Sequence, residues 1–211
     1  MKEPKLIAFE GLDGCGKTMQ IRLLEKFLVD KGHKTKVIPS LSRQGFSGDV
    51  RQKILGATGE NMNPLARQMF IMAAYMNTYH EEILPALHMG HTVLLDRTIQ
   101  LSTLAYGVAD GAPGVSMREM VDGINNATRK PDICFVIQLP FAETQARMQQ
   151  RALTETNYFD TPSYLLFGKR QHIMLQESLR YSWATLVDGN HTIANVHNAI
   201  TTHEWIKKEI R

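Results

Sequence analysis

Residues 11–18 read Gly-Leu-Asp-Gly-Cys-Gly-Lys-Thr, and this stretch constrains the fold and chemistry of the chain more than any other. It has the G-x-x-x-x-G-K-T spacing of a phosphate-binding loop, or P-loop. An apolar run at residues 5–9 precedes it, and apolar residues at helical spacing follow it until Gly32, a residue type that favours a helix C-terminus. Strand, glycine loop and helix therefore occur in the order that a P-loop requires.

Each residue type in this loop has a chemical reason to be there. The glycines let backbone N–H groups point inward around an anion, and the start of the following helix adds a favourable dipole. Lys17 can reach the β and γ phosphates of a nucleoside triphosphate, and the Thr18 hydroxyl can bind Mg²⁺. We therefore predict that a nucleoside triphosphate binds here with Mg²⁺. The predicted triphosphate-binding residues are Gly11, Leu12, Asp13, Gly14, Cys15, Gly16, Lys17 and Thr18.

Composition favours a single domain spanning 1–211, since 211 residues that are 43% hydrophobic can build one sizeable α/β core. The net charge is only +3 and no Lys/Arg run exceeds two residues, so we expect no nucleic-acid partner. No 18-residue apolar stretch is present, and Met1 to Pro4 leads directly into the first strand, so we expect a cytoplasmic protein without a membrane segment. Cys15 and Cys134 are the two cysteines, and we expect both to be free thiols.

Four further apolar runs, at residues 35–39, 91–95, 133–139 and 184–187, read as strands separated by helical patterns. The third of these runs is continuously apolar up to Gln138, as expected for a strand buried on both faces of a parallel sheet. We therefore predict an α/β fold in which helices cover both faces of a five-stranded parallel sheet. The segment at about 152–162 lacks apolar periodicity and is rich in Thr, which predicts a lid between helices.

Local signals predict three helix boundaries. Asn63 followed by Pro64 marks a helix start, and the apolar pattern continues past Pro85, which we expect to kink or interrupt the helix. Ser116 with Glu119 has the spacing of a capping box, which predicts the start of another helix. Residues 195–210 are predicted to close the chain as a helix.

Charged residues follow two of the predicted strands. Asp96 and Arg97 come directly after one apolar strand, and Arg43 stands in the loop after another. Ligands of open α/β sheets gather at the carboxyl ends of strands, so Asp96 is predicted on the Mg²⁺ side of the site. A nucleoside kinase needs a carboxylate as general base in the loop where Arg43 stands. Because an acceptor that already bears a phosphate needs cations instead, Arg43 and Arg97 favour a phosphorylated acceptor.

Four stretches make the sequence similar to the thymidylate kinase family, and together they cover nearly the whole chain. IAFEGLDGCGKTMQ resembles that family's first strand and P-loop, and LLDRTIQLSTLAYG resembles its D-R-x-x-x-S-x-x-A-Y block. KPDICFVIQL resembles its K-P-D strand, and VDGN its adenine-side turn. The resemblance implies the fold of P-loop nucleoside monophosphate kinases and transfer of the ATP γ-phosphate to dTMP, giving dTDP. It also implies a homodimer that pairs through outer-layer helices.

The resemblance further implies roles for individual residues. Lys17 and Thr18 would hold ATP and Mg²⁺, and Asp13 would lie near the acceptor's sugar hydroxyl. The P-loop lacks the arginine that some members insert there, which leaves transition-state stabilisation to arginines beside the lid. The catalytic residues implied are Lys17, Asp96, Arg97, Arg147 and Arg151, and the metal-binding residues are Thr18 and Asp96. The acceptor-binding residues implied are Asp13, Arg43, Met72, Tyr75, Arg97, Ser102 and Tyr106.

Departures from the family pattern concern the recognition of the base. Members commonly carry a thymine-reading arginine on the long third helix, where this chain has Tyr75 or Met76. The usual Arg-Glu-Pro-Gly-Gly loop is reduced to Arg-Gln-Gly at 43–45, the lid's Asp-Arg pair appears as Asn-Tyr at 157–158, and Thr98 replaces a frequent aromatic. We therefore hypothesise a relaxed or altered base pocket that admits dUMP, a 5-substituted dUMP or another deoxynucleoside monophosphate besides dTMP.

Two alternatives belong to other classes. The first is a deoxynucleoside kinase, against which the missing loop carboxylate argues. The second is a non-catalytic P-loop switch protein that binds ATP. A GTPase switch would need a base-reading Asn/Thr-Lys-x-Asp stretch, and the sequence has none.

Overall fold

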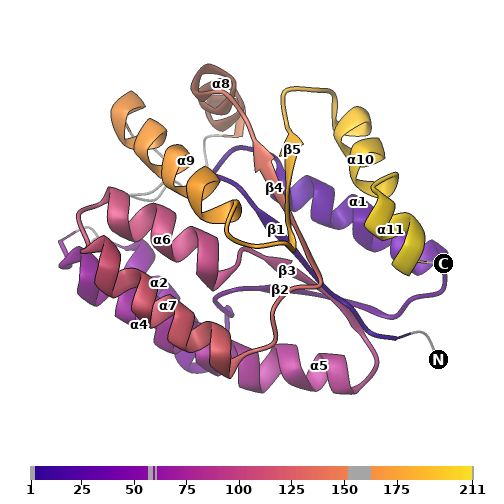
Figure 1. Ribbon diagram of the computed structural model, residues 1–211, viewed down its shortest axis with the longest axis horizontal. Coiled ribbons are helices and arrows are strands. Elements are labelled where there is room, and N and C mark those ends of the chain that lie inside the picture. The colour runs from indigo at the N-terminus through magenta and orange to yellow at the C-terminus, as the bar shows by residue number, and fades with distance from the viewer. Residues whose placement is uncertain (1–2, 57–58, 60, 152–162, 211) are drawn as a thin grey trace.

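The computed structural model describes residues 3–56, 59, 61–151 and 163–210, and its strands form one parallel sheet in the order β2-β3-β1-β4-β5 (Figure 1). β1 pairs with β3 on one side and β4 on the other, so the P-loop that follows β1 lies at the middle of the sheet's carboxyl edge. The predicted five-stranded parallel sheet is confirmed. The strands are β1 (Leu6–Glu10), β2 (Thr35–Pro39), β3 (Thr92–Asp96), β4 (Ile133–Gln138) and β5 (Ala184–Asp188).

Helices cover both faces of the sheet because alternate residues of each strand point to opposite sides. In β1, Leu6 and Ala8 pack into one core, and Ile7 and Phe9 pack into the other. One layer consists of α1 (Lys17–Asp30), α10 (Ile193–Thr201) and α11 (Glu204–Glu209). The opposite, larger layer contains α2 (Gly45–Leu55), α4 (Pro64–Thr78), α6 (Ile99–Ala109), α7 (Gly114–Ala127) and α9 (Tyr164–Ser178) (Figure 1).

The helix predicted to start at Asn63 is confirmed, and it changes pitch before Pro85. The Asn63 side chain accepts hydrogen bonds from two backbone N–H groups of the first turn, at 3.0 and 3.2 Å. α4 continues into a π-helical turn, η1 (Tyr79–Ile83), and then into α5 (Leu84–His88). Since Pro85 has no N–H to donate, the wider turn before it accommodates the expected interruption.

Two other helix boundaries differ from the sequence prediction. The helix expected to open at Ser116 begins instead at Gly114, and no side chain caps it, so the predicted capping box does not form. The closing helix predicted at 195–210 is two helices, α10 and α11. They are separated because the His203 side chain accepts a hydrogen bond from the Trp205 N–H at 3.3 Å and starts α11 as its own cap.

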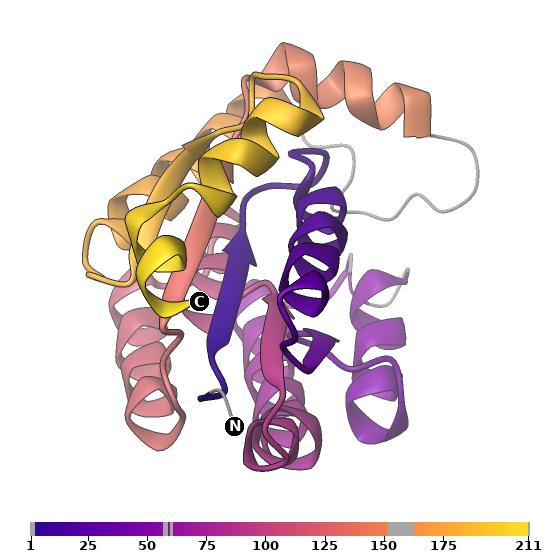
Figure 2. The same cartoon turned by 90° about the vertical axis from the view of Figure 1, so that its right-hand side faces the viewer.

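Helix α8 (Phe141–Arg151) lies across the carboxyl end of the sheet, above the P-loop (Figure 2). Phe141 at its start packs against Tyr164 and Phe167 of α9, with ring centroids 5.2 Å apart in both pairs. The predicted lid at 152–162 follows α8 in the sequence and lies outside the described residues. Among the helices of the described ranges, none is long and apolar enough to span a membrane.

Candidate active site

The P-loop forms a tight cradle between β1 and α1. Gly11, Gly14 and Gly16 have φ angles of 138°, 83° and 99°, a region that glycine adopts without steric cost. At Gly11 a Cβ would also lie 2.3 Å from the carbonyl oxygen of Ile137. Glycine is therefore required both by the backbone conformation of the loop and by its packing against β4.

Lys17 and Thr18 start α1 in different environments. Lys17 is 7% exposed, and its ammonium group donates to the carbonyl oxygens of Gly11 and Leu12 at 2.8 and 3.1 Å. Thr18 is exposed, so its hydroxyl is open to a ligand. Cys15 is buried in the apolar core that includes α1, which makes this thiol a packing residue of the loop.

Arg97 connects the P-loop with the region that faces it. Its Nη1 donates to the Gly11 carbonyl at 3.1 Å and to the Ser102 hydroxyl at 3.0 Å. Its Nη2 forms an ion pair with Asp13 and lies 3.4 Å from the Tyr106 hydroxyl. The backbone of Arg97 has φ 75°, a left-handed conformation that costs a residue with a Cβ of order 1–2 kcal/mol. Such strain is concentrated at functional sites, and here it lies at the tip of β3.

Asp13 and Tyr106 are hydrogen-bonded to each other, and their surroundings keep Asp13 ionised and Tyr106 protonated. The Tyr106 hydroxyl donates to Asp13 Oδ2 at 2.8 Å. Burial alone would raise the pKa of Asp13, but the charges of Arg97 and Lys17 and the bond from Tyr106 lower that pKa to about 2. Burial raises the pKa of Tyr106 far above its ordinary value, so the phenol keeps its proton. The site therefore presents a carboxylate that can accept a hydrogen bond from a sugar hydroxyl.

Glu10 was not singled out from the sequence, yet it fixes the start of α6. It is fully buried at the end of β1, and its carboxylate accepts the Thr98 N–H at 2.6 Å and the Ser102 hydroxyl at 2.8 Å. Thr98 in turn caps α6 by accepting the Leu101 N–H at 3.3 Å. These bonds orient Ser102 toward Arg97. The only sequence signal was an acidic residue at the end of an apolar strand, immediately before the P-loop.

Asp96 ends β3, directly before Arg97. Its Oδ1 is buried and has no hydrogen-bond partner among the described residues. A buried carboxylate oxygen without a partner fits a ligand such as hydrated Mg²⁺, as does the exposed hydroxyl of Thr18. No group of three or more His, Cys, Asp or Glu side chains placed to hold a metal occurs in the described part of the chain. This donor set suits Mg²⁺, which is bound by few protein ligands together with waters and phosphates.

A cavity of about 170 Å³ opens beside Arg97. Four of the predicted site residues line it, namely Asp13, Arg97, Ser102 and Tyr106. The rest of its wall comes largely from α2, α4 and α6. The structure thus brings residues from the P-loop, the tip of β3 and α6 together around this cavity, next to the place where a triphosphate would lie.

Arg51 of α2 also lines this cavity, although sequence reasoning did not select it. Burial and the nearby charges of Arg43 and Arg97 lower its pKa against the opposing effect of Asp96 and Asp13. Neighbouring positive charges of this kind repel one another, and an anion bound among them relieves that repulsion. Arg43 itself is exposed and lies outside the cavity lining, but it is near enough for its charge to repel that of Arg51.

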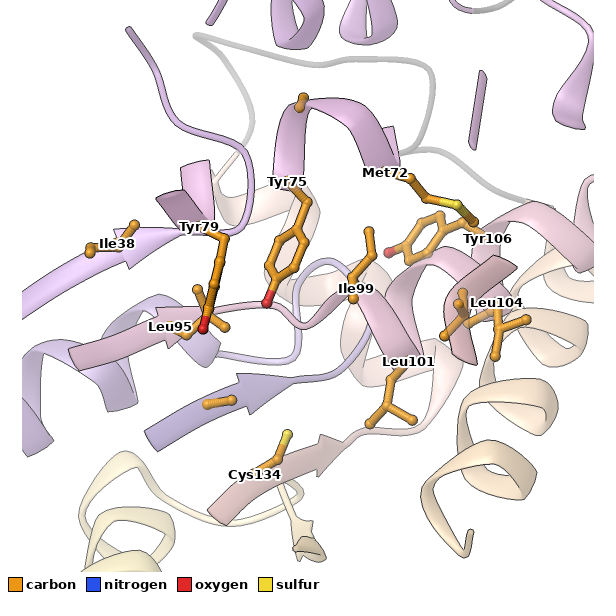
Figure 3. Close-up of a cluster of buried hydrophobic side chains, with 14 of the residues drawn as sticks. Ile38, Met72, Tyr75, Tyr79, Leu95, Ile99, Leu101, Leu104, Tyr106 and Cys134 are labelled. Carbon is orange, nitrogen blue, oxygen red and sulfur yellow. The ribbon is translucent and has the colours of Figure 1, made fainter. Parts of the chain in front are cut away.

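Two residues predicted to bind the acceptor lie in the core instead. Met72 and Tyr75 are 5% and 2% exposed and do not line the cavity. Figure 3 shows Tyr75 beside Tyr79 in the apolar cluster, with ring centroids 6.4 Å apart. Gln68 and Ile71, one turn earlier on the same face of α4, line the cavity in their place. We therefore do not retain Met72 and Tyr75 as acceptor-binding residues.

Of the two arginines predicted to stabilise the transition state, Arg147 is well placed near the loop. Its Nη2 donates to the Gly189 carbonyl at 3.0 Å, and its Nη1 lies 3.7 Å from where a Cβ on Gly16 would stand. Arg147 thus lies between the P-loop and the turn after β5. Arg151 ends α8, and its side chain lies outside the described residues.

A P-loop at the middle of a parallel sheet, beside a cavity lined by Arg51 and Arg97, is the arrangement of a P-loop kinase. The family model described as thymidylate kinase matches residues 9–200. The chain belongs to the thymidylate kinase family, as its sequence motifs predicted.

Individual relatives agree with this assignment. A thymidylate kinase of Thermoanaerobacter sp. (strain X514) is 31% identical over 147 residues, which cover 70% of this chain and 71% of that protein. A thymidylate kinase of Nitrosomonas europaea is 27% identical over 201 residues, covering 95% of this chain and 92% of that protein. Among solved structures, thymidylate kinase from Candida albicans superposes with a TM-score of 0.78 at 19% identity, covering 99% of this chain and 94% of that one. The last likeness confirms the fold.

Proposed function

We propose that this protein transfers the γ-phosphate of ATP to dTMP, giving ADP and dTDP. Family membership supports this reaction, and the observation that carries it in this chain is the position of Arg97. Its guanidinium group joins the P-loop carbonyl of Gly11 to Asp13 at the cavity. A cation in this place can hold an acceptor phosphate in line with the donor triphosphate, and such an acceptor needs no strong base. Family membership favours neither the deoxynucleoside kinase nor the switch protein.

We assign the donor side of the reaction to the P-loop and its neighbours. Loop N–H groups and Lys17 would hold the β and γ phosphates. Thr18 and Asp96 would hold Mg²⁺, which when bound would neutralise charge on those phosphates. Arg147, which lies beside Gly16, would stabilise charge that develops on the transferred phosphoryl group. For Arg151 the same role stays a prediction from the sequence.

We assign the acceptor side to the cavity. Arg97 and Arg51 would bind the acceptor phosphate, and Arg43 would add positive charge from outside the cavity lining. Asp13 would accept a hydrogen bond from the sugar hydroxyl, since its low pKa keeps it ionised at neutral pH. Ser102, held by Glu10, would keep the Arg97 side chain oriented.

An assay of coupled ADP release tests the reaction. Purified protein with ATP and Mg²⁺ is given dTMP, thymidine or no acceptor, and the products are separated by chromatography. ADP release that requires dTMP and yields dTDP is the expected result. Turnover of thymidine without turnover of dTMP would identify a deoxynucleoside kinase. ATP binding without transfer to any monophosphate would identify the switch protein.

We also propose that the protein is a cytoplasmic homodimer. The support is the family resemblance together with apolar surface on the outer layer, where Met69 and Phe70 of α4 are 53% and 49% exposed. Light scattering after size-exclusion chromatography should give twice the mass of the chain. A monomer at micromolar concentration would contradict the dimer and leave the proposed reaction untouched.

A further inference from the structure

Gln68 on α4 is a buried side chain whose polar atoms have no partner in the described part of the structure. It lines the cavity beside Arg97 but has no exposed surface of its own. Both amide atoms, Oε1 and Nε2, lack a hydrogen bond among the described residues. Buried polar groups without partners are rare because each has lost its hydration without replacement. An unsatisfied carboxamide in a cavity wall therefore indicates a ligand that satisfies it.

Two other buried glutamines differ from Gln68 in part: each has a partner for Nε2, while its Oε1 has none among the described residues. Gln20 donates through Nε2 to the carbonyl oxygen of Ile193 at 3.0 Å. Gln100 donates through Nε2 to the side chain of Asn125. Neither of these glutamines lines the cavity, and each has one amide atom anchored by the protein. Gln68, in the cavity wall, is anchored at neither atom by the described residues.

Gly107 on α6 has no side chain, and the Gln68 side chain packs into the space that a side chain there would fill. A Cβ on Gly107 would lie 2.6 Å from Gln68 Cγ and 3.1 Å from Gln68 Cδ. Gly107 is not among the glycines with positive φ, so packing against Gln68 accounts for the glycine here. It directly follows Tyr106, which lines the cavity. The amide group thus lies in the part of the wall where α4 and α6 meet.

The proposed acceptor would extend from Arg97 toward this wall. When the acceptor's phosphate lies at Arg97 and its sugar lies beside Asp13, its base extends toward α4. Ile71, three residues along α4 from Gln68, also lines the cavity and offers an apolar surface to a ring. Met76, close to where family members carry a thymine-reading arginine, does not line the cavity. Gln68 is therefore the polar group of α4 that is placed to meet the base.

A carboxamide matches the edge of a pyrimidine in either of two orientations. Thymine and uracil present N3–H as a donor and O4 as an acceptor, whereas cytosine presents N3 as an acceptor and its amino group as a donor. A carboxamide has one acceptor and one donor side by side, and a half turn about its last bond exchanges them. Because none of the described residues anchors either amide atom of Gln68, none of them selects one orientation.

We propose that Gln68 reads the Watson–Crick edge of the acceptor base and that the site consequently accepts dCMP in addition to dTMP and dUMP. This inference rests on the proposed function and specifies the acceptors of the same site. Gln68 is a specificity-determining residue in this scheme, because it contacts the base and takes no part in the transfer.

The test compares kcat/KM for dTMP, dUMP and dCMP at saturating ATP in the wild-type protein and in Gln68→Met. Methionine has a similar volume and cannot form the paired hydrogen bonds. For the wild type, dCMP should lie within about a thousandfold of dTMP, since a fixed hydrogen-bonding edge would discriminate more strongly. In Gln68→Met, kcat/KM should fall by about tenfold to a hundredfold for all three acceptors through KM, with KM for ATP unchanged.

Two controls keep the inference open to refutation. Gln176→Met changes an exposed glutamine of α9 and should leave every value unchanged. Should Gln68→Met fail to fold, N3-methyl-dTMP with the wild-type protein replaces it and should react at least about tenfold more slowly than dTMP. A folded Gln68→Met with unaltered kinetics, an N3-methyl analogue as good as dTMP, or dCMP beyond the thousandfold limit would overturn the inference. Absence of dTMP turnover in the wild type would instead refute the proposed function.

Discussion

Two arginine–carboxylate clusters lie near each other in this protein, and they differ in how far they are closed to water. In the sealed cluster, Asp110 pairs with Arg67 and Arg170, and all three side chains are only 2–3% exposed. In the open cluster, Asp13 pairs with Arg97, and these side chains are 27% and 21% exposed. The residue types are the same, so their chemistry alone does not distinguish the two clusters.

Tyr106 lies between the clusters and makes the comparison informative. The Arg170 guanidinium carbon is 4.6 Å from the centre of the Tyr106 ring, and that of Arg97 is 5.3 Å away. A buried charge is costly unless it is paired, so the sealed cluster holds α4, α9 and the end of α6 together. The open cluster keeps charge accessible to a phosphate. Exposure, more than composition, separates the charges that are closed to a ligand from the charges that a ligand can reach.

The largest effect on activity should come from the open cluster. In Arg97→Met, kcat/KM for dTMP should fall by about 10³, because the acceptor phosphate loses the one of its two cations that also contacts the P-loop. ATP affinity should stay nearly unchanged, since Lys17 and the P-loop remain. Steady-state kinetics and ATP titration measure the two effects. Arg22→Met, on the exposed side of α1, is the matched control. If Arg97→Met had the wild-type kcat/KM for dTMP, the proposed role of the open cluster in activity would be wrong.

The largest effect on stability should come from the sealed cluster. Asp110→Ala leaves the charges of Arg67 and Arg170 buried without their carboxylate, which should lower the free energy of unfolding by about 3–5 kcal/mol. Urea unfolding at neutral pH measures this change. In the control Asp122→Ala, the lost carboxylate is 50% exposed and pairs loosely with Arg180 at 3.7 Å, so the change should stay below about 0.5 kcal/mol. Equal losses in both variants would show that burial is not the deciding variable.

The sequence predicted the sheet, the P-loop and the position of Arg97 because these follow from local patterns. A strand followed by a charged pair ends at the carboxyl edge of a parallel sheet, which places Asp96 and Arg97 there without knowledge of distant contacts. Asn63 and Gly32 likewise mark helix ends by interactions within a few residues. Asn63 caps α4, and Gly32, with φ 81°, follows Lys31, the C-cap residue of α1.

The acceptor side was less predictable because it depends on how far each helix projects past the sheet. The family resemblance indicated α4 but not the level along its axis. Met72 and Tyr75 lie in the core, whereas Gln68 and Ile71, one turn earlier, line the cavity. Glu10 was missed because its partners are about ninety residues away in the chain. Long-range partners of that kind leave no local pattern in the sequence.

The pH dependence of stability should report the charge that Asp13 carries in the open cluster. The pKa of Asp13 is lowered from 3.8 to about 2 in the folded state, so its ionisation contributes stability that is present above about pH 4 and lost as the pH falls toward 2. This contribution is about 2 kcal/mol. Urea unfolding between pH 5 and pH 2 should therefore show a shallower acid loss in Asp13→Asn than in the wild type. Identical slopes would contradict the assigned role of Arg97 and Lys17 in holding that charge.

The smallest effect should come from the hydroxyl of Tyr106, because the ring that contacts both clusters remains in Tyr106→Phe. The variant loses the 2.8 Å bond to Asp13 and the 3.4 Å contact with Arg97. Stability should fall by about 1 kcal/mol, and KM for dTMP should rise a few fold at nearly constant kcat, because Asp13 keeps its charge and its arginine. Tyr181→Phe, whose hydroxyl contacts Asn125 at 3.4 Å away from the cavity, is the matched control. A loss of kcat comparable to that of Arg97→Met would mean that the hydroxyl acts on the substrate itself. Tyr106 would then be a substrate-binding residue and not only a support for Asp13 and Arg97.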